Sequence, residues 1–376
     1  MRKYGYKGSM AGAIEATAST AGQIMPPIMG LAAFIIASFL NKAYIDVALS
    51  ALIPGLLYLV GVCIAVTVYA HRYELPKLVE KVDTERIKRL LPTFIISFGV
   101  VLWLLLGYRS PAIAGLWGIA LAILFSMLQG KYRPTRKQMY DAIQEGFYLV
   151  AILSLLLVAV GPLGQVMLTT NLSGRLGSAL VQYLPDTQLI LLIGAMIVSL
   201  ILGMGLPTPV AYIIVALALV PFMQQIGIPP LQAHFFVFYF AVFSTLTPPV
   251  AVSVLAAAKL GEATFLSTAK DAIKIALTTF IIPFAFVFSP ELMSFPDVTL
   301  ETLIAVAEVI FVQLAVSVAS YGFLFRSLNG FERAAYAIVA LSGFLGFTFD
   351  TNFWYVAISL FLMISSYIFL AKKLKG

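Results

Sequence analysis

The 376-residue sequence has few charged residues, one cysteine and two histidines. Asp, Glu, Lys and Arg make up 11% of the chain, against roughly 25% in soluble domains. Because Cys63 is the single cysteine, these residues form no intrachain disulfide and no thiolate metal cage. His71 and His234 are far apart in the sequence, so no histidine-based metal site is expected. Together with a hydrophobic content of 61%, these scarcities predict an integral membrane protein.

The net charge of +7 does not indicate a nucleic-acid partner. Lys and Arg gather in short connections between apolar runs, as the positive-inside bias of membrane proteins requires. No phosphate-binding loop and no serine–histidine nucleophile pair is recognisable, so neither an enzymatic activity nor a cofactor is predicted. The basic start MRKYGYKGSM precedes a stretch with a glutamate and a double proline, which is unlike a cleaved signal peptide.

Apolar runs of about 20 residues are long enough to cross a bilayer as helices. The sequence therefore predicts an all-α polytopic fold with about ten spans. They fall at 8–40, 43–70, 93–108, 111–129, 147–169, 231–259, 272–289, 299–320, 332–349 and 352–371. One more apolar segment, 187–223, is interrupted by GMGLPTPVAY at residues 203–212. The range 71–92 is predicted to be an amphipathic helix at the cytoplasmic membrane surface, and 130–146 a further amphipathic segment there.

The charges of the connections predict the orientation of the spans. The basic connections, expected to be cytoplasmic together with both termini, are 1–7, 71–92, 130–137, 259–274, 326–333 and the C-terminal tail. The connections poor in Lys and Arg are 41–44, 170–186, 224–230, 290–298 and 350–351. The two groups fall on opposite faces only if 187–223 enters and leaves by the same face. We therefore expect a re-entrant hairpin with its tip at 203–209, in a protein of the cell inner membrane.

Two spans share a related interruption. Residues 18–33 read ASTAGQIMPPIMGLAA, and residues 243–257 read FSTLTPPVAVSVLAA. Proline lacks an amide donor and disfavours helix in the preceding residue, so each span is predicted to consist of two half-helices joined by an unwound linker. The two spans run in opposite directions by the charge pattern. Related breaks in opposed orientation are typical of the inverted repeats of secondary transporters, which bind substrate and ion at such breaks.

Unwound carbonyls and nearby hydroxyls suit a cation, whereas the N-termini of half-helices suit an anion. Ser244, Thr245 and Thr247 supply hydroxyls at the second break. Ser19, Thr20 and Gln23 supply polar groups at the first break. At the hairpin tip, Gly203 and Gly205 would let backbone approach a ligand closely, and Thr208 adds a hydroxyl. The alternative is that the prolines only kink helices that pack together.

A few isolated residues have open interpretations. Glu15, inside the first span, is either a proton-coupling carboxylate or a carboxylate near the cytoplasmic interface bonded to helix ends. Glu308 is expected to be structural. His234 is expected to snorkel at the membrane interface, and the aromatic run after it to face lipid or other helices. The tryptophans expected at interfaces or in packing are Trp103, Trp117 and Trp354.

Three stretches resemble signature sequences of the large membrane subunit of TRAP transporters, the tripartite ATP-independent periplasmic transporters. They are GAIEATASTAGQIMPPIMG, GMGLPTPVAYIIVALALVPF and HFFVFYFAVFSTLTPPVAV. The resemblance is closest to the TAXI branch, whose permeases are usually fused to the small subunit, and it covers residues 1–290. Residues 299–376, which include YGFLFRSLNGFERAAYAIVA, resemble the extra C-terminal helices of some TAXI permeases.

The resemblance implies import of a small organic acid by Na⁺ or H⁺ symport, with an elevator-type movement of a transport domain. It implies as partners a soluble solute-binding protein, a small membrane subunit or N-terminal permease fragment, and the lipid bilayer. The substrate and ion residues that it implies are Gly203, Met204, Gly205, Pro207, Thr208, Ser244, Thr245, Thr247, Pro248 and Pro249, with Ser19, Thr20, Gly22, Gln23, Pro26 and Pro27 in the symmetry-related half. A Na⁺ ion would lie at Gly203, Gly205, Thr208, Ser244, Thr245 and Thr247.

The resemblance also implies a division of the chain. Residues 1–40 would be the first discontinuous helix, 41–169 and 261–290 scaffold helices, 170–260 the hairpin and second discontinuous helix, and 291–376 a three-helix extension. A hairpin that precedes the first broken helix in the family has no counterpart here, so a split or truncated permease that does not transport alone is one expectation. Two different classes of protein stay open: an ion channel, because re-entrant loops also occur in channels, and an intramembrane enzyme, for which no catalytic constellation is found in the spans.

Overall fold

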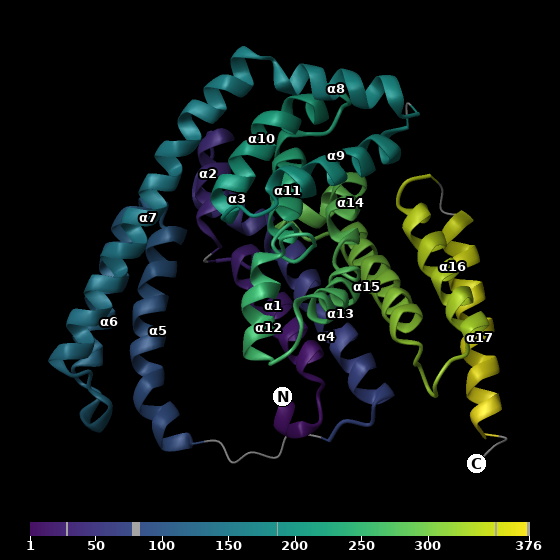
Figure 1. Cartoon of the computed structure of the whole chain (residues 1–376), viewed down its shortest axis with the longest axis horizontal. Helices are drawn as coiled ribbons and strands as arrows, with labels where there is room; N and C mark the ends of the chain where they lie inside the picture. Colours follow the sequence, from purple (N-terminus) through teal and green to yellow (C-terminus); the bar gives the residue numbers. More distant parts are fainter. Residues whose placement is uncertain (28, 77–82, 186, 350–351, 374–376) are drawn as a thin grey trace.

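The chain folds into helices joined by short connections (Figure 1). The computed structural model describes residues 1–376 except 28, 77–82, 186, 350–351 and 374–376, and it has no β-strand in the part described. The α-helices are α1 (Gly8–Ile24), α2 (Leu31–Phe39), α3 (Tyr44–Ser50), α4 (Leu52–Arg72), α5 (Thr84–Leu106), α6 (Pro111–Ser126), α7 (Arg136–Thr169), α8 (Leu172–Tyr183), α9 (Gln188–Gly203), α10 (Thr208–Gln225), α11 (Pro230–Phe243), α12 (Val252–Leu260), α13 (Phe265–Ala276), α14 (Ile281–Phe288), α15 (Leu300–Tyr321), α16 (Gly330–Gly346) and α17 (Asn352–Lys373). The described residues also form three short 3-10 helices, η1 (Arg2–Tyr4), η2 (Gly130–Tyr132) and η3 (Pro290–Met293).

Six helical stretches of the described residues are long and apolar enough to cross a membrane, or seven if the bent pair α2–α3 forms one span. Other apolar helices, such as α6, α9 and α11, are shorter than this criterion. The all-helical, polytopic fold class is therefore confirmed, while the predicted count of about ten spans stays a prediction. In Figure 1, the N-terminus, the ends of α4 and α17 and the starts of α5 and α16 lie along one lower edge.

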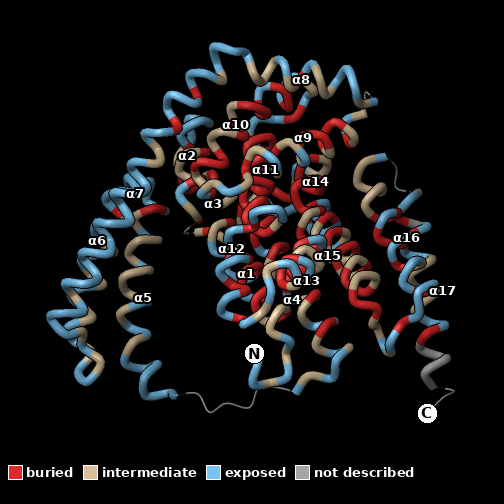
Figure 2. The backbone as a smooth tube through the Cα atoms, viewed as in Figure 1, coloured by how far each residue is buried: buried red, intermediate tan, exposed pale blue. Residues whose placement is uncertain are grey.

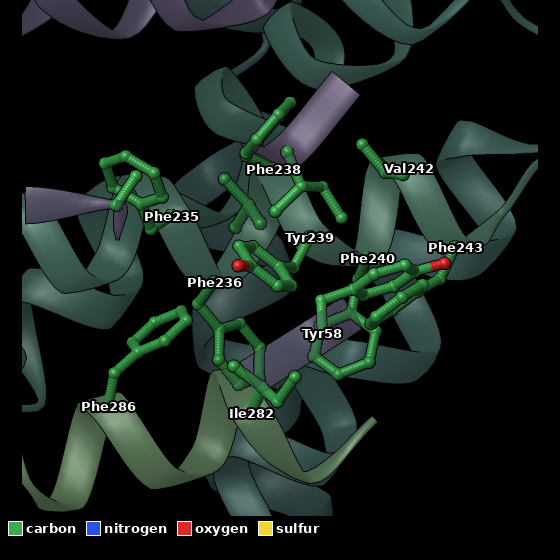
Figure 3. Packing of buried hydrophobic residues seen from close by; sticks show 14 of the residues in the cluster. Tyr58, Phe235, Phe236, Phe238, Tyr239, Phe240, Val242, Phe243, Ile282 and Phe286 are labelled. Atoms are coloured by element: carbon green, nitrogen blue, oxygen red, sulfur yellow. The ribbon is translucent and has the colours of Figure 1, made fainter. Parts of the chain in front are cut away.

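The buried core is formed by the helices from α1 to α4 and from α9 to α15, whereas α5, α6 and α7 stand to one side with mostly exposed residues (Figure 2). Every residue of α11 from Gln232 to Phe243 is buried. Its aromatic rings pack edge to face against one another and against α14, for example Tyr239 on Phe286 at 5.6 Å between centroids (Figure 3). Of the two environments expected for the aromatic run, the structure therefore shows helix contacts.

Small residues bring α1 and α12 together with opposite chain directions. A Cβ added at Gly12 would lie 2.8 Å from the carbonyl oxygen of Ala257, and Gly8 meets the backbone of Gly261. Because the early residue of α1 contacts the late residue of α12, the two helices are antiparallel. The spacing Gly8–Gly12 opposite Ala257–Gly261 is a small-xxx-small pattern, which lets membrane helices approach closely.

The other two half-helices are also antiparallel. The ring of Phe39, the last residue of α2, stacks on His234 near the start of α11, with centroids 5.6 Å apart. The two broken helices, α1–α2 and α11–α12, therefore run side by side in opposite directions, as the charge pattern predicts. Next to the start of α1 and the end of α12, the exposed Arg2 guanidinium bonds the Glu262 carboxylate at 2.7 Å and holds the pKa of Glu262 below its ordinary value.

Several expectations are wrong in detail. Residues 71–92 do not form one amphipathic helix: α4 ends at Arg72, and Asp83 accepts from the Arg86 amide to start α5, while residues 77–82 lie outside the described part. A capping box at Thr135 starts α7, so most of 130–146 is continuous with the helix predicted at 147–169. The predicted span 43–70 is divided into α3 and α4, and α3 is bent by 109° from α2.

His234 does not snorkel to an interface. Its side chain is buried, its Nδ1 lies 2.7 Å from the Tyr212 hydroxyl, and Phe39 covers its ring. Tyr212 lies on α10, so the histidine joins the second helix of the hairpin to both broken helices. The local sequence shows a polar residue at a helix start, but the partner that allows its burial is 22 residues earlier in the chain.

Helix α15, the first of the last three helices, packs along α4 and belongs to the core. The buried side-chain amide of Gln313 donates to the Leu57 carbonyl at 3.0 Å, and the ring of Tyr321 packs edge-on to Tyr69. Glu308, expected to be structural, is half-buried on α15. Trp354 packs between α15 and α16, whereas Trp103 and Trp117 are exposed on α5 and α6. Residues 299–321 are therefore an integral part of the helical body.

Candidate functional site

The interruption at 203–209 is a tight turn between two helices. Helix α9 ends at Gly203, helix α10 begins at Thr208, and Gly205 has a φ of +74°, a left-handed conformation that only glycine adopts without strain. The two helices pack against each other, and both pack on α11. The break is thus confirmed at the predicted residues, whereas the membrane face from which the segment enters stays a prediction.

The turn is tied to the second broken helix by a direct contact. The Ser244 hydroxyl lies 2.9 Å from the Gly203 carbonyl and 2.7 Å from the Ala241 carbonyl, and it is fully buried. A Cβ added at Gly203 would lie 2.7 Å from the Ser244 Oγ and 3.0 Å from its Cβ. Gly203 is therefore required for this approach, and the structure brings the predicted residues Gly203 and Ser244 together.

The linker between α11 and α12, residues 244–251, also makes hydrogen bonds to the two half-helices that it joins. The hydroxyls of Thr245 and Thr247 donate to the last carbonyls of α11, those of Val242 and Phe243. The Ser253 amide, in the first turn of α12, donates back across the two prolines to the Thr245 carbonyl at 3.1 Å. Pro248 and Pro249 are exposed, and their peptide bond is cis.

The linker contains oxygen atoms whose lone pairs accept no hydrogen bond from the described residues. The hydroxyls of Ser244, Thr245 and Thr247 give their protons to carbonyls, so their lone pairs remain available to a cation. Within the described residues, no donor reaches the backbone carbonyls of Ser244, Leu246 or Thr247. Hard oxygen ligands of this kind suit an alkali cation, and the C-terminal end of α11 adds a partial negative charge.

The first break, residues 25–30, has a hydrogen bond across its two prolines like that of the second break, and a tyrosine side chain packs over it. The Gly30 amide donates to the Gln23 carbonyl at 3.1 Å, and the Pro26–Pro27 peptide is cis. The acceptors Gln23 and Thr245 each stand three residues before the first proline of their break. The Tyr44 hydroxyl donates to the Pro27 carbonyl at 2.8 Å and lies 3.2 Å from the Met29 amide.

Tyr58 of α4 connects the two broken helices. Its hydroxyl donates to the Thr17 carbonyl of α1 at 2.8 Å, and its ring stacks on Phe243, the last residue of α11, as Figure 3 shows. Gly55, one turn earlier on α4, lies against Met25 and Pro26 at the first break. Helix α4 therefore contacts both the first broken helix and the last residue of α11.

The other residues predicted for the site at the first break lie on α1. Thr20 is buried and donates to the Ala16 carbonyl, whereas Ser19 is exposed and donates to the Glu15 carboxylate at 3.2 Å. Gly22 is exposed, and a Cβ added there would meet nothing within 4 Å. Thr208 is buried at the start of α10. A role of Glu15 in proton coupling stays a prediction.

Sequence reasoning missed the residues that hold the breaks in place: Tyr44, Tyr58, Gly55 and Ser253. The tyrosines lie in ordinary apolar stretches, and their partners are 17 and 41 residues away in sequence. The one available signal was the presence of a hydroxyl in a segment predicted to be buried, where a tyrosine needs a hydrogen-bond partner.

Two antiparallel broken helices and a glycine turn bonded to one of them form a pattern that is typical of secondary transporters. A family model described as "Tripartite ATP-independent periplasmic transporter, DctM component" matches residues 1–329. The chain belongs to this family, and it is thus a TRAP-type membrane permease chain, as the signature stretches suggested.

Three curated relatives are each 22% identical to the chain. The sialic acid TRAP transporter permease protein SiaT of Haemophilus influenzae aligns over 310 residues, 78% of this chain and 48% of that protein. The sialic acid TRAP transporter large permease protein SiaM of Vibrio cholerae aligns over 294 residues, 75% of this chain and 66% of that protein. An uncharacterized protein of Sinorhizobium fredii aligns over 273 residues, with 70% and 64% coverage. The aligned part of the chain thus spans 48% to 66% of the length of these relatives.

Proposed function

We propose that the chain is the permease of a TAXI-type TRAP transporter that imports a small organic acid by cation symport. In this proposal the solute arrives on a soluble binding protein outside the cell, a small membrane subunit completes the scaffold, and Na⁺ or H⁺ supplies the driving gradient. The family membership supports the transporter class. The Ser244–Gly203 hydrogen bond carries the site, because it places the hairpin turn directly against an unwound linker.

The proposed cation lies beside the linker 244–251. The hydroxyl oxygens of Ser244, Thr245 and Thr247 and the unbonded carbonyls next to them form a neutral oxygen-rich wall. Such a wall favours Na⁺ over a transferred proton, because it contains no group that titrates. Cation binding would draw these oxygens together and hold the turn at Gly203 in place, so that ion binding is coupled to closure of the hairpin over the solute.

Uptake measurements test the proposal. The chain is reconstituted in proteoliposomes with its small membrane subunit and binding protein, and radiolabelled lactate, succinate, benzoate and sialic acid are offered in turn. We expect saturable uptake of at least one of them that requires the binding protein and a Na⁺ or H⁺ gradient. Non-saturating ion conductance without uptake would favour an ion channel, and no uptake under any gradient would refute the proposed transport.

Replacing the threonine hydroxyls tests whether the oxygen-rich wall binds the cation. Thr245→Val and Thr247→Val keep the side-chain shape but remove an oxygen, so the Na⁺ concentration for half-maximal uptake should rise about tenfold for each lost ligand. Thr169→Val is the matched control, because that hydroxyl is exposed and bonds to carbonyls of α7. An unchanged Na⁺ dependence in both break variants, with normal expression, would show that the hydroxyls do not bind the ion.

A further inference from the structure

A cavity lies beside the first broken helix, on the side of the α2–α3 turn. It has a volume of about 330 Å³ and is bounded on one side by α2, the α2–α3 turn and α3, and on the other by the α5–α6 connection. Its polar lining residues are Ser38, Lys42, Tyr44, Tyr108, Arg109 and Ser110. This cavity, named here the outer cavity, lies between the first broken helix and the helices that stand apart from the core.

The outer cavity carries an excess of positive charge. Lys42 and Arg109 line it from different sides, and neither forms an ion pair within the part of the chain that the structure describes. One carboxylate lies close by: Asp46 accepts a hydrogen bond from the Tyr108 hydroxyl at 3.0 Å. Two cations against one carboxylate leave a net charge of +1, with the hydroxyls of Ser38 and Ser110 as further lining groups.

The position of these cations is unusual for the chain. On the predicted orientation, the connections outside the cell contain three basic residues, Lys42, Arg109 and Arg175. The positive-inside bias disfavours cations on this face, so each needs a reason to be there. Two of the three line the same cavity. A site for an anion explains that coincidence, because the two charges then have a common partner.

The outer cavity is also linked to the first break. Tyr44 lines the cavity, its ring stacks on Phe34 at 4.0 Å between centroids, and its hydroxyl donates to the Pro27 carbonyl inside the break. A molecule held in the cavity therefore contacts the residue that holds the unwound linker. Movement of that ring on binding would be passed to the break through one hydrogen bond.

We propose that the outer cavity binds a small carboxylate between Lys42 and Arg109, ahead of the site at the breaks. The inference rests on the proposed function for the class of solute. Guanidinium and ammonium groups make charge-assisted hydrogen bonds to carboxylates, and a volume of this size fits a small molecule rather than a protein loop. The cavity thus gathers the anion at the outer face, where the binding protein would release it.

Equilibrium binding tests the proposal without transport. The purified full chain is placed in phosphatidylcholine nanodiscs, and binding of radiolabelled lactate, succinate, benzoate and sialic acid is measured at low salt. At least one should bind, and the double variant Lys42→Ala/Arg109→Ala should weaken its Kd by about tenfold or more. The charge-preserving variant Lys42→Arg/Arg109→Lys should retain most of the affinity. Both side chains are exposed, so the thermal midpoint should be unchanged.

Arg175→Ala is the matched control, because Arg175 is an outer cation on α8, away from the residues of this cavity. Equal weakening by this variant would show general surface attraction and overturn the proposal. Absence of binding for all four carboxylates would overturn it as well. If the chain instead retains phosphatidylglycerol through Lys42 and Arg109 in native mass spectrometry and binds no carboxylate, the ligand is a lipid phosphate and the proposal fails.

The two proposals fail separately. If carboxylate binding depends on Lys42 and Arg109 while no gradient drives uptake, the carboxylate site in the outer cavity is supported and the transport function is refuted. If the double variant takes up solute with an unchanged KM and no carboxylate binds at equilibrium, the carboxylate site in the outer cavity is refuted and the transport function is supported. Loss of carboxylate binding in Gly205→Leu but not in Lys42→Ala/Arg109→Ala would place the anion at the breaks and overturn the outer site.

Discussion

Replacing Gly203 by alanine is expected to weaken cation-driven uptake by about tenfold to a hundredfold while the chain still inserts and folds. The new Cβ would lie 2.7 Å from the Ser244 Oγ and 3.0 Å from its Cβ, so the hydroxyl must leave the Gly203 carbonyl and the turn must move from the linker. Overpacking of this kind costs about 1–3 kcal/mol, and each 1.4 kcal/mol lost from ion binding weakens it about tenfold. Initial uptake rates across a Na⁺ titration measure the loss.

Two further variants separate the steric effect from the hydroxyl. Gly115→Ala, on α6, adds a methyl group where nothing lies within 4 Å, and it should transport normally. The double variant Gly203→Ala/Ser244→Gly restores the space but not the oxygen, so it should regain packing stability without normal Na⁺ affinity. Full uptake by Gly203→Ala itself would mean that the contact between the turn and the linker plays no part in transport.

The breaks were predictable from sequence because their causes are local. A proline lacks the amide donor that a helix needs, and Gly205 allows a positive φ, so the interruptions at 25–30, 204–207 and 244–251 follow from composition alone. The opposed directions of the broken helices were also predictable, because the Lys and Arg content of each connection indicates the membrane face on which that connection lies. Both features are confirmed by the helix bounds and by the Gly12–Ala257 and Phe39–His234 contacts.

The errors have a common physical origin in tertiary partners and helix caps. The local sequence of His234 contains no partner and so favours the interface, whereas the structure buries the side chain against Tyr212. The charge of the range 71–92 favours one surface helix, yet a cap at Asp83 begins a long helix that continues through Pro92. The outer cavity is invisible in the sequence because Lys42 and Arg109 are 67 positions apart and meet only in the fold.

Enlarging Gly12 is expected to have a large effect on stability. Even the Cβ of an alanine would lie 2.8 Å from the Ala257 carbonyl oxygen and 3.1 Å from the Thr268 methyl group, and a backbone carbonyl cannot rotate away. Helix α1 would have to separate from α12. We expect Gly12→Ala to cost about 1–3 kcal/mol and Gly12→Leu more than that. Thermal unfolding of the purified protein, followed by circular dichroism, measures the difference.

The same contact joins one half of each broken helix, so its loss should also reach the site. If α1 and α12 separate, the linkers at 25–30 and 244–251 shift relative to α4, and Tyr58 loses its place between Thr17 and Phe243. Thr268→Ser removes only the methyl contact, so it should restore part of the stability of Gly12→Ala and no more. Gly115→Leu, in open surroundings, should unfold at the wild-type midpoint. A wild-type midpoint for Gly12→Leu would show that α1 and α12 do not pack through these small residues.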